Sequence, residues 1–322
     1  MPLLEVDSLT VEYWTRRGII RAVDNVSFAL DKGEMLGLVG ESGSGKSTLG
    51  HSLVRLLPTQ GSIVGGHIRI GGKDVVGYSE EEMRSIRGEK IAFVFQDPMT
   101  SLNPVKKIGE HLVELIQTHK PNVSREEALR FAEAALDDVG ISTERINDYP
   151  HQFSGGMRQR IMIALAIALN PDIVIADEPT TALDVIVQAK IMDLLRDLCD
   201  AHGMALILIT HDISVVLERC KKVIVMYAGN FVECADSVSL HNDPKHPYTQ
   251  GLLRTVPNIE LADQRLESIT GSPPDLLDLP SGCRFWPRCP QAMKVCHMKG
   301  PSMVELENGC CVRCFLYGGL EQ

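Results

Sequence analysis

The chain has 322 residues, enough for one large domain and an appendage, and its 42 acidic and 32 basic side chains give a formal net charge of −10. That charge argues against a general nucleic-acid-binding protein, which needs a basic face. The mean hydropathy is +0.01, and neither an apolar run of about 20 residues nor a signal-peptide pattern is found, so we expect a cytosolic protein.

The N-terminal part predicts strands that lead to a phosphate-binding loop. Residues 9–13 and 22–28 alternate as strands do, and Glu34–Val39, without a charged residue after Glu34, is expected to form a buried strand. The next stretch, GESGSGKS, fits the pattern G-x-x-x-x-G-K-[ST], and a helix is expected over Lys46–Leu57. A glycine-rich run can also be a plain flexible loop, but a strand, such a loop and a helix N-terminus together form an anion site.

This loop predicts nucleoside triphosphate and Mg²⁺ as ligands. Its backbone N–H groups surround the phosphates, Lys46 adds a positive charge, and the Ser47 hydroxyl is suited to bind Mg²⁺. The residues expected to bind the nucleotide here are Gly40, Ser42, Gly43, Ser44, Gly45, Lys46, Ser47 and Thr48.

The middle of the chain predicts a helical insertion. After a short strand at His67–Ile70, set between the glycine pairs Gly65-Gly66 and Gly71-Gly72, a buried strand at 91–95 ends at Gln96. From there the pattern becomes helical: Ser124 and Glu127 form a capping box, and the helix that follows is expected to stop at Gly140. We therefore expect a helical subdomain over about 97–165.

Strands and helices alternate again in the part that follows. Strands are expected at 172–176, 204–210 and 222–228, with a helix over 185–202. Apolar strands that alternate with helices indicate a parallel sheet covered on both faces. The fold class is therefore α/β, with an antiparallel layer formed by the N-terminal strands.

Two acids follow the strand that ends at Ala176. The carboxyl ends of parallel strands are where such sheets bind ligands, so Asp177 is suited to a Mg²⁺ site and Glu178 to a general base. A strand-ending Asp-Glu pair is by itself often a helix cap. Together with the phosphate loop it points to hydrolysis of the nucleotide.

A second anion-binding helix N-terminus is expected where Ser154-Gly-Gly156 opens an apolar helix. With this motif in place, residues 3–235 resemble the ATP-binding subunits of ABC transporters, which implies a P-loop NTPase fold with a RecA-like core. The resemblance implies that Ser154, Gly155 and Gly156 are the signature motif, which binds the γ-phosphate of ATP held by an opposite subunit. Met157 departs from the pattern, where glutamine is usual, but that position carries no hydrolytic chemistry.

The same resemblance assigns further roles. Gln96 is similar to the Q-loop residue that links Mg²⁺ and the attacking water to the membrane subunits, and residues 182–184, with Asp184 as nucleotide contact, match the D-loop. His211 resembles the switch histidine of the γ-phosphate. Tyr13 resembles the aromatic residue that stacks on adenine, with Trp14 as the alternative register. The catalytic set is therefore expected to be Glu178, His211, Gln96 and Lys46, with Mg²⁺ held by Ser47, Gln96 and Asp177.

Longer stretches are similar to the ATPases of dipeptide and oligopeptide importers. These stretches are 94–104, 149–160 and 176–184, followed by the HPYT sequence that begins at His246 and by 279–283. The resemblance implies a second, usually different, ATPase subunit, two membrane permeases and an external solute-binding protein, with this chain at the cytoplasmic membrane face and no nucleic acid partner. Nickel and some sugar importers share these stretches, so they leave the solute open.

The C-terminal part is expected to be a loop-rich extension. Prolines become frequent after about residue 245, which divides the chain into an ATPase domain at 1–245 and an extension at 246–322. Six of the nine cysteines lie between Cys283 and Cys314, and disulfides are not expected in the cytosol. By resemblance to the peptide-importer ATPases, a [4Fe–4S] cluster is expected on four of them, with zinc, which also accepts four thiolates, as the alternative: Cys283, Cys289, Cys296 and Cys314.

Some questions stay open at this level. Cys310 and Cys311 complicate the ligand set, because Cys311-x-x-Cys314 is a pair that zinc sites favour, and buried free thiols are a further alternative. One rival function is a soluble ABC ATPase of DNA repair, but the low basicity of the chain argues against it. The other is a P-loop kinase or a simple nucleotide switch, which would not need Ser154–Gly156 or His211.

Overall fold

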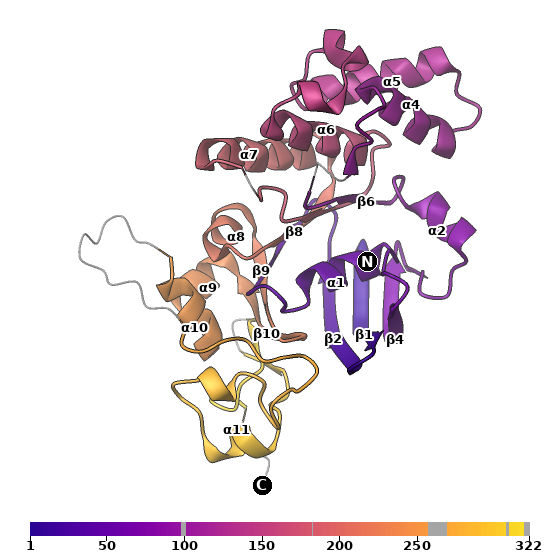
Figure 1. Ribbon diagram of the computed structural model, residues 1–322. Helices are drawn as coiled ribbons and strands as arrows, with labels where there is room; N and C mark the ends of the chain where they lie inside the picture. The colour runs from indigo at the N-terminus through magenta and orange to yellow at the C-terminus, as the bar shows by residue number, and fades with distance from the viewer. Residues whose placement is uncertain (98–100, 182, 257–268, 307–308, 319–322) are drawn as a thin grey trace. The chain divides into compact units, whose positions relative to one another are not determined.

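The computed structural model describes the chain except for residues 98–100, 182, 257–268, 307–308 and 319–322 (Figure 1). It divides into two compact units, each built from several chain segments. One unit comprises residues 1–4, 30–34 and 70–208; the other comprises residues 5–29, 35–69 and 209–322. The phosphate-loop sequence belongs to the second unit, together with the C-terminal part of the chain.

The second unit contains an antiparallel-layer sheet in which β1 lies between β2 and β4. In β1, buried residues alternate with more exposed ones, as expected for a strand with one face on the core. The strands are longer than the sequence predicts: β1 Leu4–Thr15, β2 Gly18–Leu30 and β4 Gly61–Ile70. The expected start of the strand at His67 is wrong, because β4 begins at Gly61 and passes through Gly65 and Gly66.

Close approach of the backbone explains the glycine at position 66. Gly66 has a φ of +85°, and a Cβ atom there would lie 2.5 Å from the carbonyl oxygen of Asp7 in β1. Glycine is the residue that tolerates both conditions within a strand. The glycine pair therefore marks a tight strand contact, which sequence reasoning cannot distinguish from a turn.

The strand that precedes the phosphate loop belongs to a second sheet, part of which lies in this unit. All five residues of β3 (Met35–Val39) are buried, as predicted, and β3 runs parallel to β9 (Lys222–Tyr227). The next strands are antiparallel: β10 (Asn230–Asp236) pairs with β9, and β12 (Cys311–Val312) pairs with β10. The expected α/β class with a mixed sheet is confirmed.

The helix α1 (Lys46–Leu53) follows the phosphate loop and ends four residues earlier than predicted. Arg55 has a φ of +51°, and the Leu56 N–H donates to the carbonyl oxygen of His51. Such a left-handed residue after a helix closes its last turn. Local backbone conformation therefore ended the helix, although its apolar pattern continued to Leu57.

The first unit contains the helices of the predicted insertion. Ser124 and Glu127 form the expected reciprocal capping box at the start of α5, and Gly140 follows its end with a φ of +68°. In the same unit β6 runs parallel to β7. The elements of this unit are β5 Lys73–Asp74, α2 Glu80–Ile86, β6 Ile91–Val94, α4 Ile108–His119, α5 Arg125–Asp138, η1 Thr143–Asn147, η2 Pro150–Gln152, α6 Gly155–Ile167, β7 Ile173–Asp177 and α7 Val185–His202.

The strand β8 (Ala205–Thr210) runs across the boundary of the two units, and short elements follow it to the C-terminus. The part after residue 245 is mostly irregular, as predicted, but contains a helix with Pro247 at its first position and His246 as its N-cap. The elements are α8 Ile213–Arg219, α9 Ser237–Asn242, α10 Pro247–Arg254, η3 Trp286–Arg288, α11 Lys294–Met298 and β11 Val304–Glu305. No helix in the described parts of the chain is long and apolar enough to cross a membrane.

Candidate nucleotide site

The loop between β3 and α1 curls tightly because its glycines allow it. Gly45 has a φ of +105°, and a Cβ atom there would lie 2.1 Å from the carbonyl oxygen of Ala22. No side chain can be placed at that distance from a backbone atom. Ser44 and Lys46 are buried in this turn, while Ser42 and Gly43 are exposed.

The ammonium group of Lys46 lies against the inside of this loop. Its Nζ donates to the carbonyl oxygens of Gly40 at 2.7 Å and Glu41 at 3.0 Å, and lies 3.5 Å from Ser44 Oγ. The helix α1 begins at this residue, so its first N–H groups and positive dipole end point toward the loop. A cation and backbone donors are thus held where a phosphate chain would bind.

Tyr13, the predicted adenine-stacking residue, lies beside the same helix. Its hydroxyl is 3.2 Å from the Thr48 hydroxyl, and a Cβ atom on Gly61 would lie 2.6 Å from its ring, so the ring packs on that backbone. Trp14, the alternative register, is 47% exposed. Tyr13 is thus placed next to the start of α1, and its stacking role stays a prediction.

In the other unit, β7 ends at the two predicted acids. Asp177 is buried, with 3% of its surface exposed. Glu178 has a left-handed backbone, with φ at +44°, which is costly for a residue with a side chain and is often found at functional sites. Its Oε2 accepts hydrogen bonds from Gln96 Nε2 at 3.1 Å and from Thr181 Oγ1 at 3.0 Å. The structure thus brings together Gln96 and Glu178, two residues of the expected catalytic set, and Thr181 is a contact that the sequence did not indicate.

The predicted signature motif forms the start of α6. Ser154 is the N-cap and its side chain accepts from the Met157 N–H, and both Ser154 and Gly155 are exposed. A Cβ atom on Gly156 would lie 2.6 Å from Val187 Cγ1, so this glycine allows α6 to pack closely on α7. The motif therefore presents a helix N-terminus at the surface.

The predicted D-loop lies beside this motif. Asp184 is the N-cap of α7 and accepts from the Val187 N–H at 3.0 Å, while Ala182 lies outside the described residues. The two residues that follow, Val185 and Ile186, are 80% and 69% exposed. An apolar pair is thus left at the surface next to a helix N-terminus.

His211, the predicted switch histidine, follows the buried strand β8 and is exposed. It belongs to the same unit as the phosphate loop, whereas Gln96, Glu178 and Ser154 belong to the other. The next residue, Asp212, caps α8 by accepting from the Ser214 N–H. His211 is thus fixed between a strand and a helix, at the end of a central strand.

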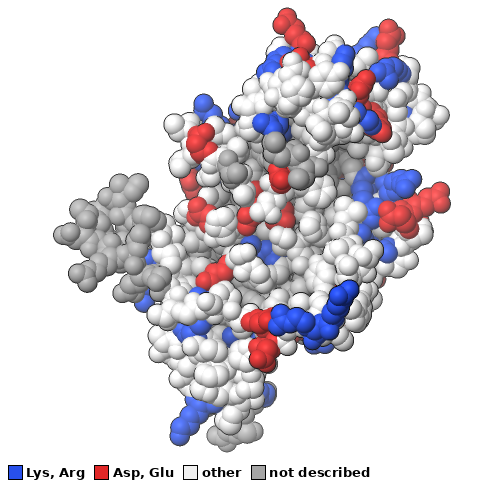
Figure 2. Space-filling model, in the orientation of Figure 1, with Lys and Arg blue, Asp and Glu red and all other residues white. Residues whose placement is uncertain are grey.

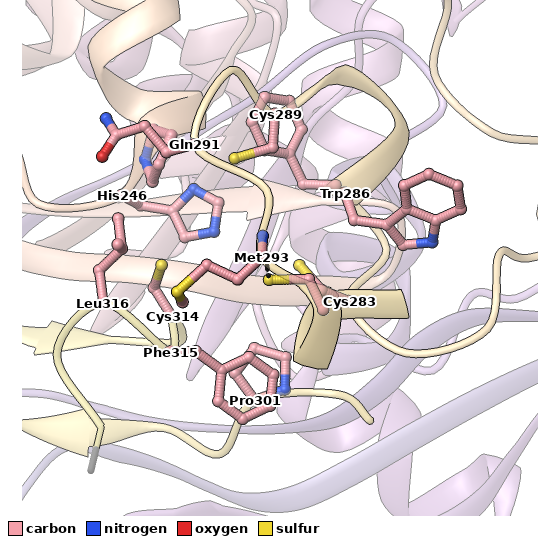
Figure 3. A pocket seen from close by; sticks show the side chains of 13 residues that line it. His246, Cys283, Trp286, Cys289, Gln291, Met293, Pro301, Cys314, Phe315 and Leu316 are labelled. Atoms are coloured by element: carbon pink, nitrogen blue, oxygen red, sulfur yellow. Dashed lines mark hydrogen bonds between the residues drawn. The ribbon is translucent and has the colours of Figure 1, made fainter. Parts of the chain in front are cut away.

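The four cysteines predicted as metal ligands line one small cavity of about 20 Å³, together with His246 (Figure 3). Burial raises the pKa of Cys283 and Cys289, and that of Cys314 to about 11. Neighbouring cysteines raise the pKa of Cys283 and Cys314 further. Across the parts of the chain that the structure describes, no group of three or more His, Cys, Asp or Glu side chains is arranged to hold a metal ion. The donor type fits a metal, since four thiols face one space, but the described arrangement is not that of a ligand set.

Cys310 and Cys311 lie apart from this cavity. Cys311 is in β12, opposite Cys234 of β10, and Cys310 is buried next to it. Neither residue lines the space shared by the four other cysteines. The alternative pair Cys311 and Cys314 is therefore not favoured by this arrangement.

Sequence reasoning missed contacts between the C-terminal part and the phosphate loop. Glu41 of the loop accepts two hydrogen bonds from Arg288 and donates its N–H to the hydroxyl of Tyr248. The HPYT sequence resembles that of the peptide-importer ATPases, but the resemblance assigns no role to its tyrosine. Nothing in the local pattern around Arg288 indicates that contact.

Comparison with known proteins defines the class. Residues 23–181 match the family described as ABC transporter. The solved dimer of the ATP-binding cassette MJ0796, in a post-hydrolysis state bound to ADP and phosphate, has a TM-score of 0.65 and 32% identity over 73% of this chain and 98% of that one. CbiO1 of Clostridium perfringens, part of an ABC transporter complex, has a TM-score of 0.64 and 26% identity over 75% and 91%. The chain is an ABC-type ATPase.

Matches over nearly the full length define the family more narrowly. Residues 232–296 match the C-terminal region of oligopeptide/dipeptide transporters. The oligopeptide transport ATP-binding protein AppD of Bacillus subtilis is 47% identical over 98% of this chain and 97% of that protein. The dipeptide transport ATP-binding protein DppD of Escherichia coli is 44% identical over 96% and 95%. The chain belongs to the family of oligopeptide/dipeptide ABC transporter ATP-binding proteins, as the motifs indicated.

Proposed function

We propose that this chain is the ATP-hydrolysing subunit of an importer of dipeptides or oligopeptides. The observation that carries the proposal is the geometry of Glu178, which follows a buried strand, has a strained left-handed backbone and accepts a hydrogen bond from Gln96, in a chain that also has a phosphate loop. The relatives AppD and DppD are transport proteins for oligopeptides and dipeptides, which supports the solute class.

Each residue of the site has a proposed role. Lys46 and the α1 N-terminus bind the phosphates, and Ser47, Asp177 and Gln96 bind Mg²⁺, which neutralises phosphate charge when bound. Glu178 holds the attacking water and accepts its proton, and His211 donates to the γ-phosphate. Tyr13 stacks on the adenine.

The catalytic site is proposed to need a second ATPase subunit. Ser154, Gly155 and Gly156 would bind the γ-phosphate of ATP held by that subunit, with Asp184 as a further contact. The exposed apolar residues Val185 and Ile186 beside them support a protein-covered surface here. One chain alone would then bind ATP and hydrolyse it slowly.

We further propose that the chain works at the cytoplasmic face of the membrane, bound to two permeases that receive solute from an external binding protein. Figure 2 shows acidic and basic side chains interspersed on the face in view, and the net charge is −10. This charge pattern supports a protein partner rather than a nucleic acid. The helical insertion, at about 97–165, and Gln96 would pass the closing motion to the permeases.

Isolation of the intact complex tests the transport function. The chain should co-purify with integral permeases and with a second ATPase, and ATP-dependent uptake into proteoliposomes should follow the affinities of the external binding protein for dipeptides and longer peptides. If the external binding protein prefers nickel chelates or oligosaccharides, the importer carries that solute instead of peptides. Salt-sensitive DNA binding without permeases would refute it.

The cysteine cavity is proposed to hold a [4Fe–4S] cluster on Cys283, Cys289, Cys296 and Cys314, with zinc as the alternative. Support comes from the four thiols that line one cavity. A bound metal would keep these cysteines deprotonated, because its positive charge offsets the cost of burying thiolates, and the cluster's role would be structural. Anaerobic purification followed by iron, sulfide and zinc analysis tests this: a colourless protein that carries zinc would refute the iron–sulfur assignment.

A further inference from the structure

Glu41, the second residue of the phosphate loop, is held by all three of its polar groups. Its carboxylate accepts from Arg288 through Nη1 at 2.6 Å and Nη2 at 2.9 Å, and its N–H donates to the Tyr248 hydroxyl at 2.9 Å. Its carbonyl oxygen accepts from Lys46 Nζ. Two of the three partners come from the C-terminal part, 207 and 247 positions further along the chain.

The arginine side of this contact is rigid and buried. Only 4% of the Arg288 side chain is exposed, and its Nε donates to the carbonyl oxygen of Thr270 at 3.0 Å. The hydrogen bonds to Glu41 raise the pKa of Arg288, so it stays charged. A planar guanidinium that binds both oxygens of a carboxylate sets its orientation, which a lysine could not do.

The tyrosine side is equally constrained. Tyr248 has no exposed surface, and its ring packs on Tyr227 and Phe285 with centroids 4.6 Å and 5.4 Å away. Its hydroxyl therefore has a fixed position at the loop. Phe285 and Arg288 both lie in the short segment between Cys283 and Cys289, so the segment that carries the cysteines also carries this contact.

Binding of ATP would change one of the three contacts of Glu41 and leave the other two. The Lys46 ammonium would turn from the carbonyl oxygens of Gly40 and Glu41 to the phosphates, which removes hydrogen bonds that now hold the loop in its curved form. The contacts from Arg288 and Tyr248 do not involve that ammonium. They can keep the loop curved while Lys46 moves.

We propose that Arg288 and Tyr248 are positioning residues for the phosphate loop: through Glu41 they hold it in the form that binds ATP. The inference rests on the proposed ATP-binding role of Gly40–Ser47 and deepens it. It assigns to the C-terminal region of this family member a direct function in nucleotide affinity, in addition to any cofactor that its cysteines hold.

The test compares Arg288 with Arg284, two arginines of the segment between Cys283 and Cys289 that have different partners. Arg288→Met removes the contact with Glu41. Arg284→Met is the matched control, because Arg284 is also largely buried and binds Asp24 and the carbonyl oxygen of Ala228, but does not contact Glu41. The dissociation constant of a fluorescent ATP analogue is measured on the full chain, with Lys46→Ala as the reference for lost phosphate binding.

We expect Arg288→Met to weaken binding about tenfold, the loss typical of a removed hydrogen bond to a charged group, and Arg284→Met to bind like the wild type. Tyr248→Phe, which removes only a hydroxyl, should weaken binding about threefold and decides the matter if Arg288→Met does not fold. In the intact complex, Arg288→Met should raise the KM for ATP and leave kcat unchanged.

Wild-type affinity in both Arg288→Met and Tyr248→Phe would overturn the inference, and so would an equal loss in Arg284→Met, because that would indicate general loosening of the segment. If the wild type binds ATP and Lys46→Ala does not, the proposed ATP-binding role of Gly40–Ser47 stands whatever these variants show. If the wild type itself does not bind ATP, both proposals fail.

Discussion

Replacement of Glu178 by glutamine gives the sharpest test of the hydrolytic assignment. Glutamine has nearly the same shape, and its amide oxygen can accept the hydrogen bonds that Glu178 receives from Gln96 and Thr181. The left-handed backbone at this position is equally costly for both residues. We therefore expect the free energy of unfolding to change by no more than about 0.5 kcal/mol.

The substitution should instead lower the rate of the chemical step, the hydrolysis of bound ATP. A positioned general base accelerates a reaction by about 10²- to 10⁴-fold, and a neutral amide cannot accept the proton of the attacking water. At 1.36 kcal/mol for each factor of ten, the activation free energy should rise by about 2.7–5.4 kcal/mol. Affinity for ATP should stay close to that of the wild type, because Glu178 is not a phosphate ligand.

The assay is phosphate release by the assembled complex, in which the partner subunit's own catalytic site is inactivated so that only this site turns over. Nucleotide affinity and thermal unfolding are measured on the same preparations. Glu133→Gln, an exposed glutamate on α5, serves as the control and should hydrolyse ATP like the wild type. Sustained hydrolysis by Glu178→Gln would refute the assignment of the general base.

Three further predictions follow from the geometry. Gly45→Ala should abolish ATP binding, because a Cβ atom there meets a backbone oxygen at 2.1 Å; Gly43→Ala, which has open space around it but a left-handed backbone with φ at +77°, should lose less, and equal affinities in a nucleotide-binding assay would contradict this. Tyr13→Ala should weaken ATP binding by about 1–3 kcal/mol through lost stacking, and Tyr13→Phe should not, as measured by titration with ATP. Burial raises the pKa of Cys199 to about 12, so at pH 8 this thiol stays protonated and should resist alkylation in the folded chain, as mass spectrometry can detect; rapid labelling without denaturant would argue against its burial.

Local sequence patterns predicted those parts of the fold that depend on neighbouring residues. The capping box of Ser124 and Glu127 forms as expected, since its partners are three residues apart. The buried strand β3 and the turn before Lys46 follow in the same way from an apolar run and from glycines that alone accept the required backbone. The same patterns overestimated the length of α1 and began β4 too late, at His67, because Arg55 and Gly66 adopt conformations that their neighbours do not dictate.

The candidate site also has parts that local sequence predicts and parts that only long-range packing decides. Motifs at Gly40–Ser47, Asp177-Glu178 and Ser154–Gly156 determine by themselves that this chain handles a nucleoside triphosphate, because the required donors and acids lie within a few residues of each other. Only the tertiary structure decided that Gln96 donates to Glu178, and that Glu41 is held by Tyr248 and Arg288. Contacts between segments about 80 to 250 positions apart depend on how an entire unit packs, and no local preference encodes them.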